Sequence, residues 1–211
     1  MRDHRIFATF YDRMVASMER EIFGPRRAKL LGELTGDVLD VGAGTGANLV
    51  HFGAADRVVA AEPDRAMRAR LLRKLNGARV PVEVSDAGAE QLPFAGGSFD
   101  SVVFTLVLCT IPDPDGALSE ARRVLKPGGR ILVLEHVRAA DRALARWQDR
   151  ITPLWRWVGA GCHPNRDTRA SIEQAGFRFT SVEEFQPIPK WIPTSPMLQA
   201  VAVRQNRGSH G

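Results

Sequence analysis

The amino-acid sequence predicts an α/β fold, in which helices cover both faces of a parallel sheet. Short apolar runs alternate through the middle of the chain with segments whose apolar residues recur every three or four positions. The first apolar run, at residues 38–41, ends in glycines, which is typical of a strand that enters a tight turn. The chain has 211 residues, 44% of them hydrophobic, so a single domain can bury a core of its own.

Strands and helices are expected to alternate up to residue 135. Apolar residues at every fourth position predict a helix over residues 64–75, with Asp64 placed to cap its first turn. The Lys126-Pro127-Gly128-Gly129 segment is expected to end a later helix and to turn into a fifth strand. The strands are expected at residues 38–41, 57–62, 80–85, 101–109 and 130–135, and a short helix at residues 47–52.

The two ends of the chain have a different organisation. Residues 5–34 are expected to be helical, with an apolar stripe that includes Phe10 and Tyr11. A second amphipathic helix is expected at residues 139–158, where Pro153 is expected to cause a kink. The chain is expected to finish with a helix at residues 166–175, capped by Asn165, and with strands at residues 177–185 and 197–204.

The charge of the chain is basic but mixed. The formal net charge is +5, and arginine supplies most of the positive charges. Acidic residues are interspersed along the whole chain, and no long block of like charges occurs. This pattern favours a solvated surface over a nucleic-acid interface, so nucleic acid is not the expected partner.

The cysteines and the apolar runs bear on the protein's surroundings. Cys109 and Cys162 are too few for a disulfide framework, and they do not group with histidines at the spacing of a zinc site. No metal is therefore expected, and the environment is expected to be a reducing cytoplasm. The apolar run at residues 102–109 is too short to span a bilayer, and no secretory signal is recognisable. We expect a cytoplasmic monomer or homodimer without a transmembrane segment.

The strongest functional signal is the VLDVGAGTGA segment, residues 38–47. Glycines after a strand let the chain turn with positive φ and let a ligand approach the backbone. The spacing also fits a dinucleotide-binding pattern, and Glu62 at the end of the second strand suits ribose hydroxyls in both cases. Asp40 distinguishes a site for a dinucleotide from a site for a positively charged nucleoside. A carboxylate two residues before the first glycine repels a pyrophosphate but attracts a ligand that carries an ammonium and a sulfonium.

Four segments of the chain resemble, in order and spacing, the class I S-adenosylmethionine-dependent methyltransferases: VLDVGAGTG, AEPD, GAEQLPFAGGSFDSVV and IPDPDGALSEARRVLKPGGRILVLEH. The resemblance covers residues 37–135. It implies a Rossmann-like, doubly wound sheet of seven strands, mostly parallel with an antiparallel last strand, and an N-terminal helical lid. The implied single domain comprises that lid (1–34), a donor-binding core (37–135), acceptor-side helices (136–176) and C-terminal strands (177–204).

The resemblance also implies which residues bind S-adenosylmethionine. Asp40 and the glycine turn would hold the methionine portion, and Glu62 the ribose hydroxyls. Gly88 stands where the family often has an aspartate, so the amide of Ala89, or else Glu90 or Asp86, is expected to replace that contact with the adenine. The implied donor-binding residues are Tyr11, Asp40, Gly42, Ala43, Gly44, Gly46, Glu62, Pro63, Ala89, Glu90, Thr105 and Leu106.

The remainder of the chain resembles a narrower group. The segments TLVLCTIPD, LEHVR, GCHPNRDT and PKWIP are similar to those of thiol methyltransferases and of bacterial phospholipid N-methyltransferases. Animal members carry a hydrophobic N-terminal membrane anchor, which is not recognisable in this sequence, so membrane attachment is not carried over. Aromatic side chains near both ends predict an apolar pocket for a small lipophilic or lipid-like acceptor: Phe10, Tyr11, Trp147, Trp155 and Trp191. The segment with Trp147, Trp155 and Trp157 is interpreted as an apolar lid or core face, or else as a weak contact with a membrane surface.

Methyl transfer from a sulfonium is an in-line displacement, so the protein mainly aligns the reactants and excludes water. Orientation alone can supply about 7–11 kcal/mol. A base is needed only where the acceptor loses a proton, as a thiol or hydroxyl does. His136 and His163 are the candidates for that role, because imidazole titrates near neutrality.

Three other functions remain open at this point. The basic charge is compatible with an RNA methyltransferase, whose binding would depend on salt. The glycine turn is equally compatible with a non-catalytic protein that binds S-adenosylmethionine or S-adenosylhomocysteine. A nicotinamide-dependent oxidoreductase is the third alternative, and the methylated atom (S, N, O or C) is also left open.

Overall fold

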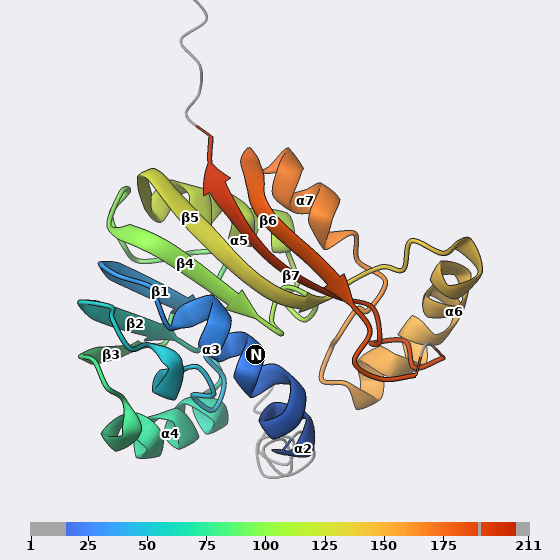
Figure 1. Ribbon diagram of the computed structural model, residues 1–211, viewed down its shortest axis with the longest axis horizontal. Helices are drawn as coiled ribbons and strands as arrows, with labels where there is room; N and C mark the ends of the chain where they lie inside the picture. Colours follow the sequence, from blue (N-terminus) through green and yellow to red (C-terminus); the bar gives the residue numbers. More distant parts are fainter. Residues whose placement is uncertain (1–15, 190, 206–211) are drawn as a thin grey trace, which may run out of the picture. The chain divides into compact units, whose positions relative to one another are not determined.

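A computed structural model describes residues 16–189 and 191–205 (Figure 1). The chain divides into two compact units, residues 1–89 and residues 90–211. Each unit has its own strands and its own helices. The single-domain organisation expected from the sequence stays a prediction.

The first unit contains three parallel strands in the order β3-β2-β1. Strands β1 and β2 are buried over most of their length, and apart from the buried Asp40 their buried residues are apolar. The elements of this unit are α2 (Ala16–Met18), η1 (Glu19–Phe23), α3 (Gly24–Leu31), β1 (Asp37–Val41), η2 (Leu49–His51), β2 (Arg57–Ala61), α4 (Arg65–Lys74), η3 (Leu75–Gly77) and β3 (Val82–Ser85).

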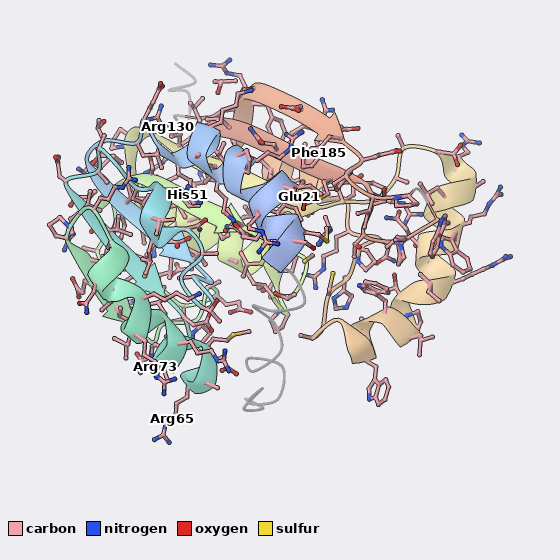
Figure 2. All side chains as sticks on the ribbon, turned by 60° about the horizontal axis from the view of Figure 1, so that its bottom comes forward. Glu21, His51, Arg65, Arg73, Arg130 and Phe185 are labelled. Atoms are coloured by element: carbon pink, nitrogen blue, oxygen red, sulfur yellow. The ribbon has the colours of Figure 1, made fainter. Side chains whose placement is uncertain are left out.

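Helix α4 begins where the sequence predicts. The Asp64 carboxylate accepts hydrogen bonds from the amides of Ala66 and Met67, at 2.8 and 2.9 Å, and so caps the first turn. The inner face of the helix packs Leu71 against a small core cluster with Ala43, Leu49 and Ala60. On its outer face, Arg65 and Arg73 point into solvent, in keeping with the solvated arginines expected from the charge pattern (Figure 2).

The second unit contains four strands in the order β4-β5-β7-β6. Strands β4 and β5 are parallel, whereas β7 runs antiparallel to both of its neighbours, β5 and β6 (Figure 1). The predicted antiparallel last strand is therefore confirmed. The elements of this unit are β4 (Phe99–Thr105), α5 (Pro114–Val124), β5 (Leu125–His136), α6 (Arg142–Val158), α7 (Thr168–Gln174), β6 (Phe177–Phe185) and β7 (Met197–Arg204).

Several boundaries differ from the sequence expectation, each for a local reason. The fourth strand ends at Thr105 and not at residue 109, because Leu106 adopts a positive φ of 58° and turns the chain. The Lys126-Pro127-Gly128-Gly129 segment does not separate a helix from a strand. It forms an irregularity inside β5, where Phe99 pairs with Leu125 and Ser101 pairs with Arg130.

Two helix starts also differ from the expectation. The helix expected at residues 47–52 is reduced to the short 3-10 turn η2, because the glycine turn still occupies residues 42–46. Helix α7 is capped by the Asp167 carboxylate, which accepts from the Ala170 amide at 3.0 Å, and not by Asn165. Asn165 instead donates to the Asp149 carboxylate of α6 at 2.9 Å.

The buried side chain of Gln148 connects helix α6 to the loops of its own unit. The Gln148 amide oxygen accepts from the Ala139 amide at 2.8 Å. Its Nε2 lies within 2.9–3.1 Å of the carbonyl oxygens of Val137, Pro164 and Pro193. These backbone groups come from three different loops, so Gln148 fixes the position of α6 on all three.

We predict that Gln148→Leu destabilises the protein by about 2–4 kcal/mol, because the substitution leaves a buried amide and buried carbonyls without partners. Thermal unfolding of wild type and variant measures the loss. Gln91→Leu, at an exposed position, is the control and should change the stability by less than about 0.5 kcal/mol. Equal stability of the two variants would show that Gln148 does not anchor α6.

Candidate functional site

The turn after β1 is made by glycines with left-handed backbone conformations. The φ angles of Gly42, Gly44 and Gly46 are 65°, 57° and 82°, a region that other residues rarely adopt. The Ala43 amide donates to the Ala61 carbonyl at 3.0 Å, which ties the turn to the end of β2. Gly42 and Gly44 are partly exposed, which leaves room for the predicted approach of a ligand to their backbone.

Ala43 and Gly46 have a different part in the same turn. The Ala43 side chain is buried in the core cluster with Leu49 and Leu71, so only its backbone can face a ligand. A Cβ atom at Gly46 would lie 2.9 Å from Cδ1 of Leu49. Gly46 is therefore required by packing as well as by its positive φ.

Asp40 is fully buried on β1 and belongs to a chain of polar side chains. Asn48 Nδ2 donates to Asp40 Oδ1 at 2.8 Å. The Asn48 side-chain oxygen accepts from the buried Arg27 guanidinium of α3, and Arg27 in turn pairs with Glu19 at 2.9 Å. This chain of contacts orients the Asp40 carboxyl group beside the turn that follows β1.

The second carboxyl oxygen of Asp40, Oδ2, is buried and lacks a hydrogen-bond partner among the described residues. Burial raises the pKa of Asp40 from 3.8 to about 7, although the bond from Asn48 and the charge of Arg27 act in the opposite direction. A buried acceptor without a donor is costly unless a ligand supplies one. The ammonium group of an amino-acid ligand would satisfy Oδ2, so this observation fits the methionine portion of S-adenosylmethionine.

Glu62 follows β2 and connects two parts of the unit. Its Oε2 accepts from the Gly44 amide and its Oε1 from the Asp64 amide, both at 2.8 Å. Burial raises its pKa, and these two backbone bonds offset part of that effect. A carboxylate can accept about four hydrogen bonds. Glu62 therefore retains acceptor capacity for the two hydroxyls of a ribose while it also shapes the glycine turn.

The other donor-side candidates of the first unit lie around these residues. Pro63 is partly exposed, and its carbonyl accepts from Arg68 at 3.1 Å. Ala89 is buried near the end of this unit. Asp64, the neighbour of Pro63, caps α4 with its carboxylate, which limits how this side chain can turn toward a ligand. Tyr11 lies outside the described residues.

In the second unit, the turn after β4 is organised by a buried acid. Glu135 Oε1 accepts from the amides of Val107 and Leu108, at 2.6 and 2.7 Å. Thr105 is buried at the strand end, and Leu106 is partly exposed with its amide bonded to the Leu134 carbonyl at 2.8 Å. Burial raises the pKa of Glu135 to about 7, and the amide bonds lower it in part. Glu135 thus fixes the backbone conformation of the turn that begins at Thr105 and Leu106.

His136, at the end of β5, is held in one tautomer. Its Nδ1 lies 2.8 Å from the Thr194 carbonyl oxygen, which can only accept, so Nδ1 carries the proton. Nε2 then has a lone pair. Burial lowers the pKa of His136 to about 4, so the ring is neutral at physiological pH. This pKa makes His136 a weaker base than the unperturbed imidazole on which the sequence prediction rests.

His163 lies in the loop before α7 and is partly exposed. Its amide donates to the Cys109 carbonyl at 2.7 Å, and its Nδ1 lies 3.3 Å from the same oxygen. Burial and the charges of Arg166 and Arg156 lower its pKa. Arg166 itself donates to the carbonyls of Leu108 and Ile111, so the turn after β4 has a cation beside it.

One sequence candidate remains to be located, and three further residues near the site were not singled out by sequence patterns. Glu90, one of the sequence candidates, is exposed, and its Oε1 is 3.5 Å from the Asp113 amide. Sequence patterns did not single out Arg27, Asn48 or Glu135, although each contacts a predicted site residue or its turn. Arg27 and Glu135 could have been noticed as charged residues inside otherwise apolar patterns.

Metal-binding clusters and membrane-spanning helices are both missing from the part of the chain that the structure describes. Within residues 16–189 and 191–205, three or more His, Cys, Asp or Glu side chains are nowhere grouped so as to hold a metal ion. The described helices include none with the length and apolar character needed to cross a bilayer.

The comparisons with known proteins agree on one type of enzyme. A family model described as a methyltransferase domain matches residues 39–133, which span the glycine turn, Glu62 and most of β5. The human thiol S-methyltransferase TMT1B is 35% identical over 199 residues, which cover 92% of this chain and 81% of that protein. The Escherichia coli ubiquinone/menaquinone biosynthesis C-methyltransferase UbiE is 34% identical over 164 residues, which cover 66% of this chain and 65% of that protein.

A solved structure shows the same fold. An S-adenosylmethionine-dependent methyltransferase from Thermotoga maritima is similar with a TM-score of 0.67 and 23% identity, over 96% of this chain and 99% of that one. The predicted Rossmann-like α/β fold is therefore confirmed.

We predict that Gly46→Ala destabilises the protein by more than Gly97→Ala. Both glycines have a positive φ, 82° and 72°, so both substitutions incur the same backbone strain of about 1–2 kcal/mol. Only at Gly46 does the new Cβ also meet a side chain, since nothing lies within 4 Å of a Cβ at Gly97. Urea unfolding of both variants measures the difference, and equal losses would refute the packing role of Gly46.

We also predict that Asp40→Asn becomes more favourable for stability as the pH rises. The folded wild type, with a pKa of about 7 at Asp40, keeps a proton that the unfolded chain releases above about pH 4. Wild-type stability therefore falls between about pH 4 and pH 7, by at most about 4 kcal/mol. The side-chain amide of the variant does not titrate, so the variant carries no such penalty.

Thermal unfolding of both proteins at about pH 4.5, 6 and 8, without ligand, checks this linkage. The stability difference, variant minus wild type, should grow over this range, whereas Gln91→Leu, which removes no titrating group, should show a constant difference. A constant difference for Asp40→Asn would mean that burial does not raise the pKa of Asp40 in the folded protein.

Proposed function

Because the chain belongs to the class I S-adenosylmethionine-dependent methyltransferases, we propose that it transfers a methyl group from S-adenosylmethionine to the sulfur of a small, lipophilic thiol. The enzyme class follows from the family. The acceptor is the proposal, and the observation that supports it most is the 35% identity to a thiol S-methyltransferase over 92% of the chain. Neither an RNA acceptor nor a purely binding function is favoured by these relatives.

We assign donor binding in the first unit to the residues around the glycine turn. The unpartnered Oδ2 of Asp40 would accept from the ammonium group of the donor, and the partly exposed Gly42 and Gly44 would contact its methionine portion through their backbone. The Glu62 carboxylate would accept from the ribose hydroxyls. S-adenosylmethionine supplies a methyl group that is already activated by its sulfonium, so no metal is needed in the proposed reaction.

The proposed reaction is an in-line displacement at carbon. A lone pair of the acceptor sulfur forms the new S–C bond while the bond between the methyl carbon and the sulfonium breaks, and its electron pair stays on the donor's sulfur. The acceptor thiol loses its proton. Since even the thiol of cysteine has a pKa of about 8.5, at most a few per cent of a comparable or less acidic thiol is thiolate at neutral pH, and deprotonation contributes to the barrier.

We assign the proton acceptor to His136 or His163, both in the second unit. The neutral ring of His136 has its Nε2 lone pair free to accept, because Nδ1 donates to the Thr194 carbonyl. A base with a pKa near 4 takes a thiol proton only with help from a nearby positive charge. At His163 that charge is present, since Arg156 and Arg166 are close enough to lower its pKa and would favour a thiolate.

We further propose that the enzyme acts in the cytoplasm. Cys109 and Cys162 are both free and buried, which suits a reducing compartment.

The experiment for the acceptor is a methyl-transfer assay with S-adenosylmethionine and a matched panel of a hexyl thiol, a hexyl amine, hexanol and a short RNA. We expect turnover with the thiol only. Turnover with the RNA or the amine, and none with the thiol, would overturn the proposed acceptor while leaving the enzyme class intact.

For the donor site, we predict that Asp40→Ala weakens S-adenosylmethionine binding by about 10- to 100-fold, because a buried charge-assisted hydrogen bond is worth about 1.5–3 kcal/mol. Calorimetric titration measures the affinity. Asp56→Ala, at an exposed position of the same unit, is the control and should bind as wild type does. Unchanged binding by Asp40→Ala would remove Asp40 from the donor site.

For the base, we predict that the loss of kcat/KM in the His136→Ala or His163→Ala variant depends on the acidity of the thiol. An alkyl thiol must be deprotonated on the enzyme, whereas an aryl thiol is largely thiolate at about pH 7.5 and needs no base. The variant that lacks the base should lose at least about tenfold more activity with the alkyl thiol. If both variants lose equally with both thiols, neither histidine accepts the proton.

A further inference from the structure

The outward face of α6 combines large apolar side chains with arginines. Trp157 is 84% exposed, Leu154 60% and Trp147 42%, although such side chains are normally covered. They share one side of the helix because their positions are separated by three or four residues or by multiples of a turn. The exposed residues of this face are Ala143, Arg146, Trp147, Arg150, Pro153, Leu154 and Trp157.

The opposite face of α6 is already occupied by the protein. Ala145, Gln148 and Thr152 are buried there, and Gln148 is bonded to three loops. The Arg138 guanidinium makes a two-bond ion pair with Asp149, at 2.6 and 2.8 Å. The helix is thus held in one orientation, and the apolar side chains of its outer face are presented to solvent. Figure 1 shows α6 projecting away from the strands of its own unit.

A second aromatic side chain extends this face beyond the helix. Trp147 Nε1 donates to the backbone carbonyl of Trp191 at 2.9 Å, which ties the loop before β7 to α6. The Trp191 side chain is 71% exposed. Three tryptophans and one leucine therefore lie exposed on this helix and the loop that it holds.

The charge of the face is positive. A hollow of about 380 Å³ lies on the helix surface between Ala143, Arg146, Trp147 and Arg150. Among the described residues, Arg146 and Arg150 take part in no ion pair with an acidic side chain. The acidic groups of the helix are elsewhere: Asp149 is neutralised by Arg138, and Asp141 caps the first turn by accepting from the amides of Ala143 and Leu144.

We propose that this face of α6 docks the protein on the surface of a bilayer that contains anionic phospholipids. Tryptophan is favoured at the boundary between headgroups and acyl chains, where its ring is buried and its N–H stays near polar groups. Each arginine near an anionic surface adds about 1 kcal/mol. A helix with this combination lies in the plane of the interface and does not span the membrane.

Two other partners fit the face less well. A nucleic acid would be bound by the arginines and by stacking on tryptophan, but Leu154 and Pro153 offer it nothing. A second copy of this chain would present the same positive face, so Arg146 and Arg150 would oppose their own counterparts. The proposal does not depend on the identity of the methyl acceptor.

The test is co-sedimentation of the full chain with vesicles of phosphatidylcholine alone or with about 30 mol% phosphatidylserine, at low and at high salt. We expect binding to the anionic vesicles, weakened by salt, and a blue shift of tryptophan fluorescence on binding. The paired variants Leu154→Ser/Trp157→Ser and Arg146→Gln/Arg150→Gln should each lower the partition coefficient by at least about tenfold. All four side chains are exposed, so both variants should unfold at the wild-type temperature.

The matched control lies on α4, which also exposes a leucine beside arginines. Leu72 is 51% exposed, and Arg65 and Arg73 point into solvent (Figure 2). The triple variant Leu72→Ser/Arg65→Gln/Arg73→Gln removes a comparable patch from another helix and should bind anionic vesicles as wild type does.

Three results would overturn the proposal. The first is the absence of vesicle binding by wild type. The second is that the α6 variants bind vesicles as well as wild type does, or that the α4 control loses as much binding as they do. An equal loss in the control would mean that binding depends on the overall charge of the protein and not on α6. The third is that the α6 variants lose affinity for single-stranded RNA, or lose a dimer seen by sedimentation velocity, while vesicle binding is unchanged.

Discussion

The burial of the Asp40 carboxyl group is the constraint on which the polar contacts of the first unit depend. The charged form of a group with only one hydrogen-bonded oxygen is unfavourable in an apolar strand, and its pKa is raised to about 7 as a result. Asn48 holds the bonded oxygen, and Arg27 reaches Asn48 from α3. The glycine turn beside the strand end is partly exposed, so a cationic ligand there would donate a hydrogen bond to the unpartnered Oδ2 of Asp40.

The second unit uses a similar device at the end of β5. Glu135 is also fully buried with a raised pKa, but its Oε1 is occupied by the amides of Val107 and Leu108. Both acids also have a second oxygen, Asp40 Oδ2 and Glu135 Oε2, that is buried without a hydrogen-bond partner among the described residues. They differ in what the first oxygen bonds, which is the Asn48 side chain at Asp40 and two backbone amides at Glu135. The chain turns at Leu106 with a positive φ, which is an unfavourable backbone conformation for leucine. The hydrogen bonds to Glu135 stabilise this turn and offset that cost.

The order of strands and helices could be predicted, because each element carries its own apolar period. The boundaries that failed depend on interactions between distant residues. Nothing in the local pattern around residue 106 indicates that the strand stops there, since the bonds that hold the turn come from Glu135, which is 28 residues from Val107 and 27 from Leu108. Likewise, Asn165 resembles a helix cap, but Asp149 of α6 engages its side chain and leaves the cap to Asp167.

Residue type and short spacing along the chain were enough to predict the fold class and the glycine turn, and to select Asp40 and Glu62 as candidate site residues. The candidate site residues chosen in this way remain predictions. Their chemical state came only from the folded chain. It partly buries His136 and fixes its proton on Nδ1, leaves Asp40 Oδ2 without a donor among the described residues, and turns one face of α6 outward. Protonation and exposure depend on the three-dimensional surroundings of a side chain, which local sequence does not contain.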